Sequence, residues 1–126
     1  MEIQNPPRLL YEFTNIRGEA DTVFECPCCR LPTIAEPGGY EICNICGWED
    51  DDSFGGGPNH CSLDEAQRNF QLHQHMYDSD HSSSNKPRRN EFLVTCIALL
   101  NDFKKQADPQ KRGVLFEAFI IESEWL

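Results

Sequence analysis

The chain has 126 residues, which is enough for one domain around a single modest core and too few for two full domains. Its formal net charge of −10 is uneven, because residues 1–65 hold 13 acidic and 3 basic side chains while residues 66–126 hold 8 of each. This balance argues against nucleic acid and anionic lipid as partners, and no apolar run approaches the roughly 20 residues needed to span a bilayer.

The chain opens with a polar segment, residues 1–7, that holds no apolar signal sequence, so the expected location is the reducing cytoplasm. Residues 8–14 (RLLYEFT) are rich in aromatic and branched side chains with partial alternation, which predicts a strand. A polar connection follows over residues 15–21. A second strand is predicted at Thr22–Glu25, directly before the first cysteine motif.

Four cysteines form two CxxC pairs with thirteen residues between them: Cys26 and Cys29 within CPCC, and Cys43 and Cys46 within CNICG. Each CxxC turn can direct two sulfurs at one centre, and zinc prefers a tetrahedral shell of four thiolates. The spacing therefore predicts that these four side chains bind Zn²⁺.

The residues around the two cysteine motifs support this prediction. Pro27 stiffens the first turn, and Gly47 allows the positive φ that lets backbone amides face the sulfurs after Cys46. Two short strands, Thr33–Ala35 and Tyr40–Ile42, are predicted on either side of a Pro-Gly-Gly turn, as a hairpin that brings the motifs together. Short strands with two CxxC turns make a zinc ribbon.

Disulfide bonds and a thioredoxin-like redox pair are the alternatives for a chain with 7 cysteines. Disulfides are disfavoured in the expected compartment, and a redox pair needs only one CxxC, usually at the start of a helix. Cys28 lies between two predicted ligands, in a turn that can use only its first and last sulfur. We expect Cys28 to be a spare thiol that could exchange into the zinc shell or respond to oxidant.

Residues 48–59 (WEDDDSFGGGPN) combine four consecutive acids with three glycines and a proline, which predicts a loop. Trp48 is expected to cap the small core. The acids lack the alternating oxygen ligands of a calcium-binding loop, so a hard-cation site is disfavoured. We instead expect a contact set for a cationic partner, formed by Trp48, Glu49, Asp50, Asp51 and Asp52.

A capping box, Ser62-Leu63-Asp64-Glu65, predicts a helix that begins near Leu63 and ends around Tyr77. His73 and His75 are two residues apart, so they cannot share a metal ion from one helical face. Residues 78–90 have the composition of an exposed linker.

Residues 91–106 carry apolar side chains at a helical repeat, which predicts an amphipathic helix with Cys96 in its apolar face. Asp108-Pro109 ends this helix and can begin another, while residues 114–126 fit either helix or strand and favour helix only weakly. The sequence leaves open whether this tail packs on its own ribbon or on a partner. The predicted units are residues 1–80 (zinc ribbon with an N-terminal strand), 81–90 (polar linker) and 91–126 (helical tail).

The motifs CPCC, GGYEICNICGWEDDD, GGPN and SLDEAQRNF together resemble the bacterial cysteine-rich CPCC family over about residues 24–77. Members of that family carry CPCC, a YEICPVCFWEDD-like stretch, and a GGPN or GGAN turn before SLxEAR. Gly47 stands where phenylalanine is common, which improves the second turn. Arg30 stands where glycine is usual, which is expected to loosen the first. The resemblance implies metal binding through the cysteines and no established activity.

The predicted fold class is a small α+β protein: a zinc ribbon followed by a helix, with an N-terminal strand and a C-terminal helical tail. The predicted function is a non-enzymatic, zinc-binding interaction domain of the kind that serves as an immunity protein or antitoxin against a cationic bacterial toxin. A small rigid fold with its negative charge concentrated in one half would attract a basic protein quickly. The sequence does not specify the oligomeric state.

Two other classes of function remain open. A structural or adaptor ribbon could hold a partner, or a second copy, through Phe92, Leu99 and Phe103 of the tail. An enzyme is disfavoured, because four cysteines fill the zinc tetrahedron and leave no position for an activated water. An acid–base group built from His60, Cys61 and the acidic loop lacks a spacing that would make these side chains converge.

Overall fold

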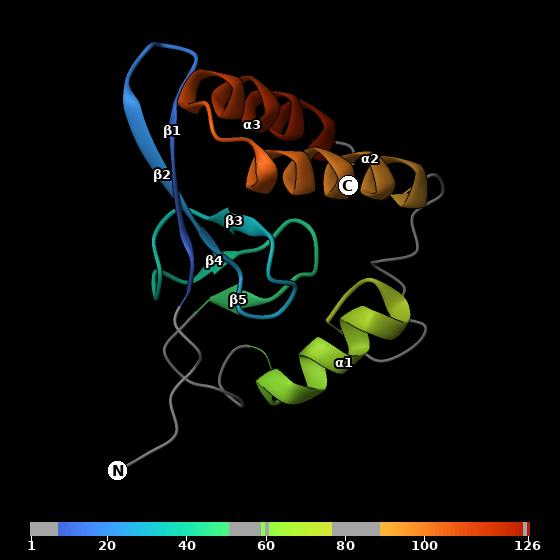
Figure 1. Cartoon of the computed structure of the whole chain (residues 1–126). Helices are drawn as coiled ribbons and strands as arrows, with labels where there is room; N and C mark the ends of the chain where they lie inside the picture. The colour runs from blue at the N-terminus through green and yellow to red at the C-terminus, as the bar shows by residue number, and fades with distance from the viewer. Residues whose placement is uncertain (1–7, 51–58, 60, 77–88, 125) are drawn as a thin grey trace.

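The structure is a computed structural model that describes residues 8–50, 59, 61–76, 89–124 and 126. Asp51, Asp52, His60 and the predicted linker as far as residue 88 lie outside the described part. The described strands occupy the middle of the molecule, with two C-terminal helices on one side and one helix on the other (Figure 1).

Three antiparallel strands form the first sheet, in the order β1-β2-β3: β1 (Leu10–Thr14), β2 (Ala20–Glu25) and β3 (Pro32–Ile34). Successive side chains of a strand point to opposite faces. Tyr11 and Phe13 of β1 are accordingly buried, whereas the residues between and before them are exposed. The two predicted N-terminal strands are thus confirmed, and they pair with each other.

The second sheet contains β4 (Glu41–Ile42) and β5 (Glu49–Asp50), which pair antiparallel. The predicted hairpin between the third and fourth strands is therefore wrong, because β3 pairs with β2 and β4 pairs with β5. The prediction of a loop from Trp48 onward is also wrong at its start, where β5 forms. Each CxxC motif consequently connects the two strands of its own hairpin.

Helix α1 spans Leu63–His73, and its N-terminus carries the predicted capping box. The amide of Glu65 donates to Ser62 Oγ at 3.1 Å, and the amide of Ser62 donates to Glu65 Oε1 at 3.1 Å. The helix ends four residues earlier than predicted, because Gln74 adopts a left-handed conformation (φ 65°). The chain then turns back, and the amide of Met76 donates to the carbonyl of Cys46 at 2.8 Å.

The C-terminal segment forms two helices, α2 (Arg89–Lys105) and α3 (Pro109–Ser123), which lie side by side (Figure 1). Asp108 caps α3 by accepting from the amide of Gln110 at 3.0 Å, and Pro109 occupies the first turn as predicted. Residues 114–123 are therefore helical. No helix in the described part of the chain is long and apolar enough to cross a membrane.

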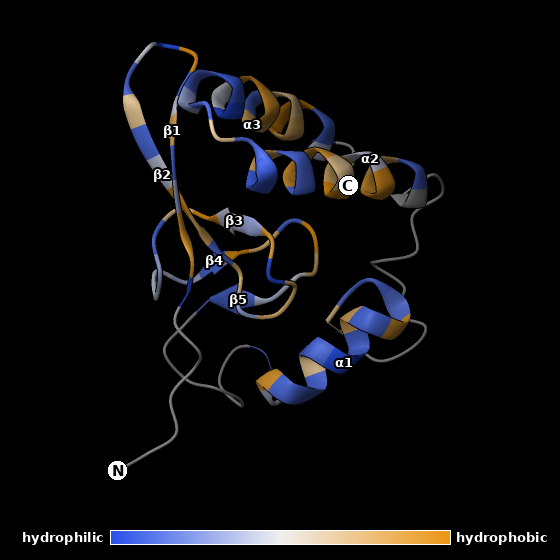
Figure 2. Ribbon diagram, in the orientation of Figure 1, coloured by the Kyte–Doolittle hydropathy of each residue, from blue (hydrophilic) through white to orange (hydrophobic). Residues whose placement is uncertain are grey.

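Both C-terminal helices pack on the strands of the same chain. Phe103 of α2 is fully buried, with its ring 5.6 Å from Tyr11 and 5.7 Å from Phe13 between centroids. Phe103 is therefore not available to hold a partner, as the adaptor interpretation required. Apolar residues gather along the paired helices and the central strands, whereas α1 is mostly hydrophilic (Figure 2).

Helix α3 approaches the backbone of the first sheet closely at Gly113. A Cβ atom at this position would lie 1.8 Å from the carbonyl oxygen of Thr14 and 2.9 Å from its carbonyl carbon. Real Cβ atoms do not approach backbone this closely, so only glycine lets the first turn of α3 rest on the end of β1. This contact sets the position of α3 relative to the β1–β2 hairpin.

Replacing Gly113 with alanine should destabilise the protein, although a glycine-to-alanine substitution in a helix is usually stabilising. Glycine to alanine inside a helix ordinarily stabilises by about 1 kcal/mol. In Gly113→Ala, we expect the free energy of unfolding to fall by at least about 2 kcal/mol, because α3 must move away from Thr14. Denaturant unfolding measures the change, with the exposed Ala98→Gly of α2 as the helix-propensity control. A more stable Gly113→Ala would contradict the contact.

Candidate metal centre

The two CxxC motifs form turns of the same design, one in each hairpin. In the first turn, residues 26–30, the amide of Arg30 donates to the carbonyl of Cys26 at 2.8 Å. In the second turn, residues 43–47, the amide of Gly47 donates to the carbonyl of Cys43 at 2.9 Å. A second hydrogen bond closes each hairpin, from the amide of Cys26 to Leu31 and from that of Cys43 to Trp48.

The residue that ends each turn has a positive φ, 64° at Arg30 and 91° at Gly47. This conformation favours glycine, which explains the glycine expected after a CxxC pair. Arg30 nevertheless adopts it, and its guanidinium forms an ion pair with the buried Glu25 at 3.2 Å. The expected loosening of the first turn is not observed, because its closing hydrogen bond is as short as that of the second.

Four sulfurs converge where the two turns meet. The Sγ atoms of Cys26, Cys29, Cys43 and Cys46 all lie within 4.8 Å of one another. Cys26 and Cys46 are 3.6 Å apart, and Cys29 and Cys43 are 3.7 Å apart. Zn–S bonds of about 2.3 Å in a tetrahedron separate the sulfurs by about 3.8 Å, whereas a disulfide needs about 2.05 Å. The cluster has the dimensions of a metal site, and its cysteines are free thiols.

The cluster is closed to solvent on most sides, because Cys26, Cys43 and Cys46 are buried and Cys29 is half-buried. Burial raises the pKa of the Cys26, Cys29 and Cys46 thiols. Burial also acts to raise the pKa of Cys43, but hydrogen bonds from the other three thiols and from Thr33 hold it well below its usual value. The hydrogen bonds from the other three thiols and from Thr33 thus favour the thiolate form of Cys43.

Thr33 is the site residue that the sequence did not reveal. Its hydroxyl lies 3.0 Å from Cys43 Sγ and donates to it. The only sequence signal was a hydroxyl side chain within an otherwise apolar strand between the motifs. Such a donor orients a metal-bound thiolate and reduces its negative charge density.

Helix α1 and the residues just after it form hydrogen bonds to the backbone of both cysteine turns. The side chain of Gln67 donates to the carbonyl of Pro27 at 2.9 Å, in the first turn. Met76, just beyond α1, contacts the second turn through its amide, as described above, and Asn69 donates to the carbonyl of Met76 at 2.9 Å. One helix therefore links both cysteine turns.

The remaining cysteines lie outside the four-sulfur cluster. Cys28 is 4% exposed and packs in the same apolar core. Cys61 is half-buried, and burial raises the pKa of its thiol. Cys96 is fully buried on α2, and burial raises its pKa to about 11, as expected of an unreactive core thiol. His73 and His75 stack with centroids 5.8 Å apart and belong to no metal cluster found among the described residues.

The predicted partner-contact set needs correction at two positions. Trp48 is 2% exposed and Asp50 is 0% exposed, so neither side chain can meet a partner. Trp48 packs in the core around the cysteines, as a cap of that core should. Glu49 is half-buried in β5. The sequence predicted this contact set on the assumption that residues 48–52 form an exposed loop. Instead, β5 pairs with β4, and the side chains of Trp48 and Asp50 are buried.

Asp50 instead anchors the N-terminal segment. Its carboxylate accepts from both terminal nitrogens of Arg8, at 2.6 and 2.7 Å, and from the amide of Gly38 at 2.9 Å. Such a forked contact satisfies a buried charge more fully than a single hydrogen bond. The sequence did not indicate this pair, because its members are separated by 42 residues.

The strands, the two turns and the sulfur cluster define a small α+β protein of the ribbon type with four cysteines that could hold a metal ion. The family model described as "Cysteine-rich CPCC" matches residues 24–91. This is more than half of the chain, and the chain belongs to that family. No curated protein and no solved structure matches the chain.

Loss of one ligand should abolish metal binding. We expect Cys43→Ser to lose stoichiometric zinc and to unfold around Trp48, because zinc binding and folding are coupled in sites of this kind. Elemental analysis and tryptophan emission measure the two effects. Cys28→Ser and Cys96→Ser should both keep one zinc ion per chain. Zinc loss in Cys28→Ser would instead make Cys28 a ligand, and zinc retained in Cys43→Ser would contradict the site.

Metal binding by these four thiols should also depend on pH, and zinc is the ion used to test it. Three of the four thiols have a raised pKa and are neutral near pH 7, whereas zinc binds thiolates, so protons compete with the metal. The affinity for zinc should therefore fall as the pH falls, and loading should release about three protons per ion. Calorimetry in buffers of different ionisation enthalpy counts these protons. If no protons are released, the prediction that these thiols are protonated before they bind the metal is wrong.

Removing the partner of Asp50 should cost far more than removing an exposed ion pair. Arg8→Met keeps the aliphatic stem but leaves a buried carboxylate without its cation, so we expect the free energy of unfolding to fall by about 3 kcal/mol. Arg17→Met, in the exposed pair with Glu19, should cost less than about 0.5 kcal/mol. Denaturant unfolding compares the two, and equal costs would show that the buried pair adds no stability.

Proposed function

We propose that the chain is a non-enzymatic, Zn²⁺-binding interaction protein whose partner is a basic protein, and that it acts as an immunity protein or antitoxin by neutralising a cationic toxin. The observation that carries this proposal is the closed cluster of four sulfurs. Soft thiolates in a tetrahedron suit zinc, and a complete shell leaves no position for water or substrate. The metal then stabilises the fold and takes no part in a reaction.

The charge of the first half of the chain supports a basic partner. Residues 1–65 contain only 3 basic side chains. Each of these forms an ion pair: Arg8 with Asp50, Arg17 with Glu19, and Arg30 with Glu25. A four-thiolate zinc site would add a charge of about −2. The acids left over on the surface therefore dominate the field of this half and would steer a cationic protein towards it.

We propose the β1–β2 hairpin as the contact surface, in place of the buried Trp48 and Asp50. Glu12, Glu19 and Asp21 are all exposed on this hairpin. The hairpin extends beyond the rest of the first sheet and lies alongside α3 (Figure 1). Because α3 supports it, the hairpin can present its acids to a partner with little loss of conformational freedom.

Salt dependence tests the proposal directly. The candidate partner is the basic product of a reading frame next to the gene for this chain, purified and titrated at about 50 and 200 mM salt. We expect the affinity to fall at least tenfold over this range, because surface charge attraction is screened. Co-expression should also relieve the growth inhibition that the partner causes alone.

Matched variants locate the surface. The double variant Glu12→Gln with Glu19→Gln removes two acids from the hairpin and should weaken partner binding about tenfold. The control, Asp102→Asn with Glu124→Gln, removes the same charge from α2 and the end of α3 and should change the affinity less than threefold. Binding that ignores salt, or that responds equally to both variants, would contradict the proposal.

A further inference from the structure

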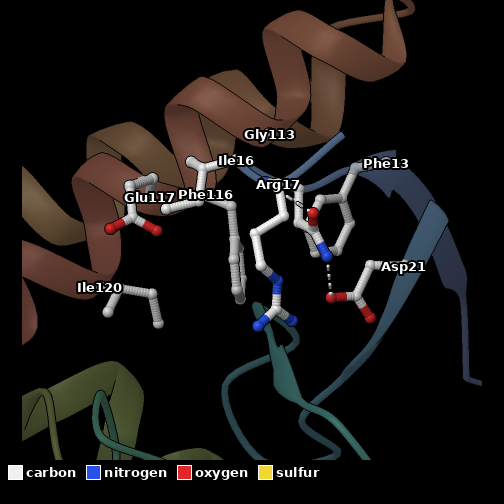
Figure 3. A pocket seen from close by; sticks show the side chains of 9 residues that line it. Phe13, Ile16, Arg17, Asp21, Gly113, Phe116, Glu117 and Ile120 are labelled. Atoms are coloured by element: carbon white, nitrogen blue, oxygen red, sulfur yellow. Dashed lines mark hydrogen bonds between the residues drawn. The ribbon is translucent and has the colours of Figure 1, made fainter. Parts of the chain in front are cut away.

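A pocket lies between the β1–β2 hairpin and α3, away from the sulfur cluster. Its volume is about 290 Å³, just below the range of about 300–1,000 Å³ for ligand sites. Apolar walls come from Phe13, Ile16, Phe116 and Ile120, and the polar lining includes Arg17, Asp21 and Glu117. Figure 3 shows Asp21 and Glu117 on opposite sides, with the Phe116 ring and the Arg17 side chain between them.

Phe13 and Phe116 of the pocket lining belong to the apolar core between α3 and the first sheet, whereas Ile16 and Ile120 are exposed. Phe13 is 5% exposed, and its ring packs against Phe116 with centroids 5.1 Å apart. Gly113 lines the pocket at the point where α3 contacts Thr14, and because it has no side chain it leaves this part of the pocket open. The cavity lies between α3 and the hairpin, and Asn15, Ile16 and Arg17 of the turn that joins β1 to β2 complete its lining.

Carboxylates outnumber cations at the pocket. Asp21 and Glu117 line it, while the one lining cation, Arg17, is already paired with Glu19 at 3.3 Å. Asp21 accepts hydrogen bonds from its neighbours, the amide of Thr22 at 2.8 Å and the side chain of Asn15 at 3.5 Å, but within the described part of the chain no Lys or Arg forms an ion pair with it. An anionic ligand would be repelled, and a purely apolar one would desolvate the acids without compensation.

We propose that this pocket receives one arginine or lysine side chain of the basic partner. The aliphatic stem would lie against Ile16, Ile120 and the phenylalanine rings, and the cationic head would meet the carboxylate of Asp21 on one side of the pocket or that of Glu117 on the other. This inference rests on the proposed function, because it names the group by which the basic partner is held.

The same seam already holds an arginine in this manner. The guanidinium carbon of Arg112, also on α3, lies 5.3 Å from the ring centroid of Tyr11 and 5.4 Å from that of Phe103. Its nitrogens donate to the carbonyls of Phe103 at 3.2 Å and Glu12 at 2.9 Å. Where α3 packs on the hairpin, aromatic rings and carbonyl oxygens thus bind a guanidinium of the same chain. The pocket offers aromatic rings and carboxylate oxygens to a guanidinium of another protein.

The first experiment uses N-acetyl-arginine amide as the probe and follows the methyl signals of Ile16 and Ile120 by NMR. We expect saturable shifts at these methyls with a dissociation constant on the order of 1 mM, because a single side chain provides few contacts. N-acetyl-glutamine amide, of similar length and without charge, should bind at least tenfold more weakly. If the arginine probe shifts signals over the acidic surface and leaves these methyl signals unchanged, the pocket is not the binding site.

Matched variants separate the pocket from the general field. Asp21→Asn with Glu117→Gln should weaken the probe at least tenfold, whereas Glu36→Gln with Glu124→Gln, which removes the same charge elsewhere, should change it less than twofold. Arg17→Ala should tighten binding, since it removes the competing cation. Equal weakening by both pairs of substitutions would overturn the pocket as the site.

The two proposals can fail separately. If the partner binds with the expected salt dependence and Asp21→Asn with Glu117→Gln leaves its affinity unchanged, the pocket inference is wrong and the proposed function stands. If the probe saturates the pocket but no basic protein binds the chain, the proposed function is wrong, and the pocket remains an arginine-binding site without that partner.

Discussion

The convergence of four cysteine sulfurs is the constraint on which the rest of the first half depends. The two hairpins that carry them contain strands of only two to six residues, too short to be stable alone. Their turns meet at the sulfurs, and α1 then joins both turns through Gln67 and Met76. A metal ion bound at this point would add to the apolar core that the cysteines share with α2 and α3.

Three arginines add contacts between segments of the fold. Arg8 ties the N-terminal segment to β5 through Asp50, Arg30 secures the first cysteine turn through Glu25, and Arg112 fastens α3 to β1. These contacts also explain how an acidic chain can bury two carboxylates, because each receives a guanidinium. The acids that face solvent carry the charge on which the proposed partner contact depends.

The metal site and the proposed contact surface therefore lie in different parts of the fold. The cluster sits where the two hairpins meet, whereas the pocket and the hairpin acids lie along α3. Helix α3, which falls outside the region matched by the family model, supplies Gly113, Phe116 and Glu117 to the pocket. The family region thus provides the metal site, and the C-terminal addition completes a second surface.

The sequence by itself determined the local features, because these depend on neighbouring residues: the two CxxC turns, the capping box of α1, and the Asp-Pro start of α3. It also predicted the four-cysteine grouping, since few arrangements other than a metal site use that spacing. Only the tertiary structure decided which strands pair, that Trp48 and Asp50 are buried, and that Phe103 packs on β1. Those outcomes depend on contacts between residues far apart in the chain, such as Arg8 with Asp50, for which local periodicity and propensity carry no signal.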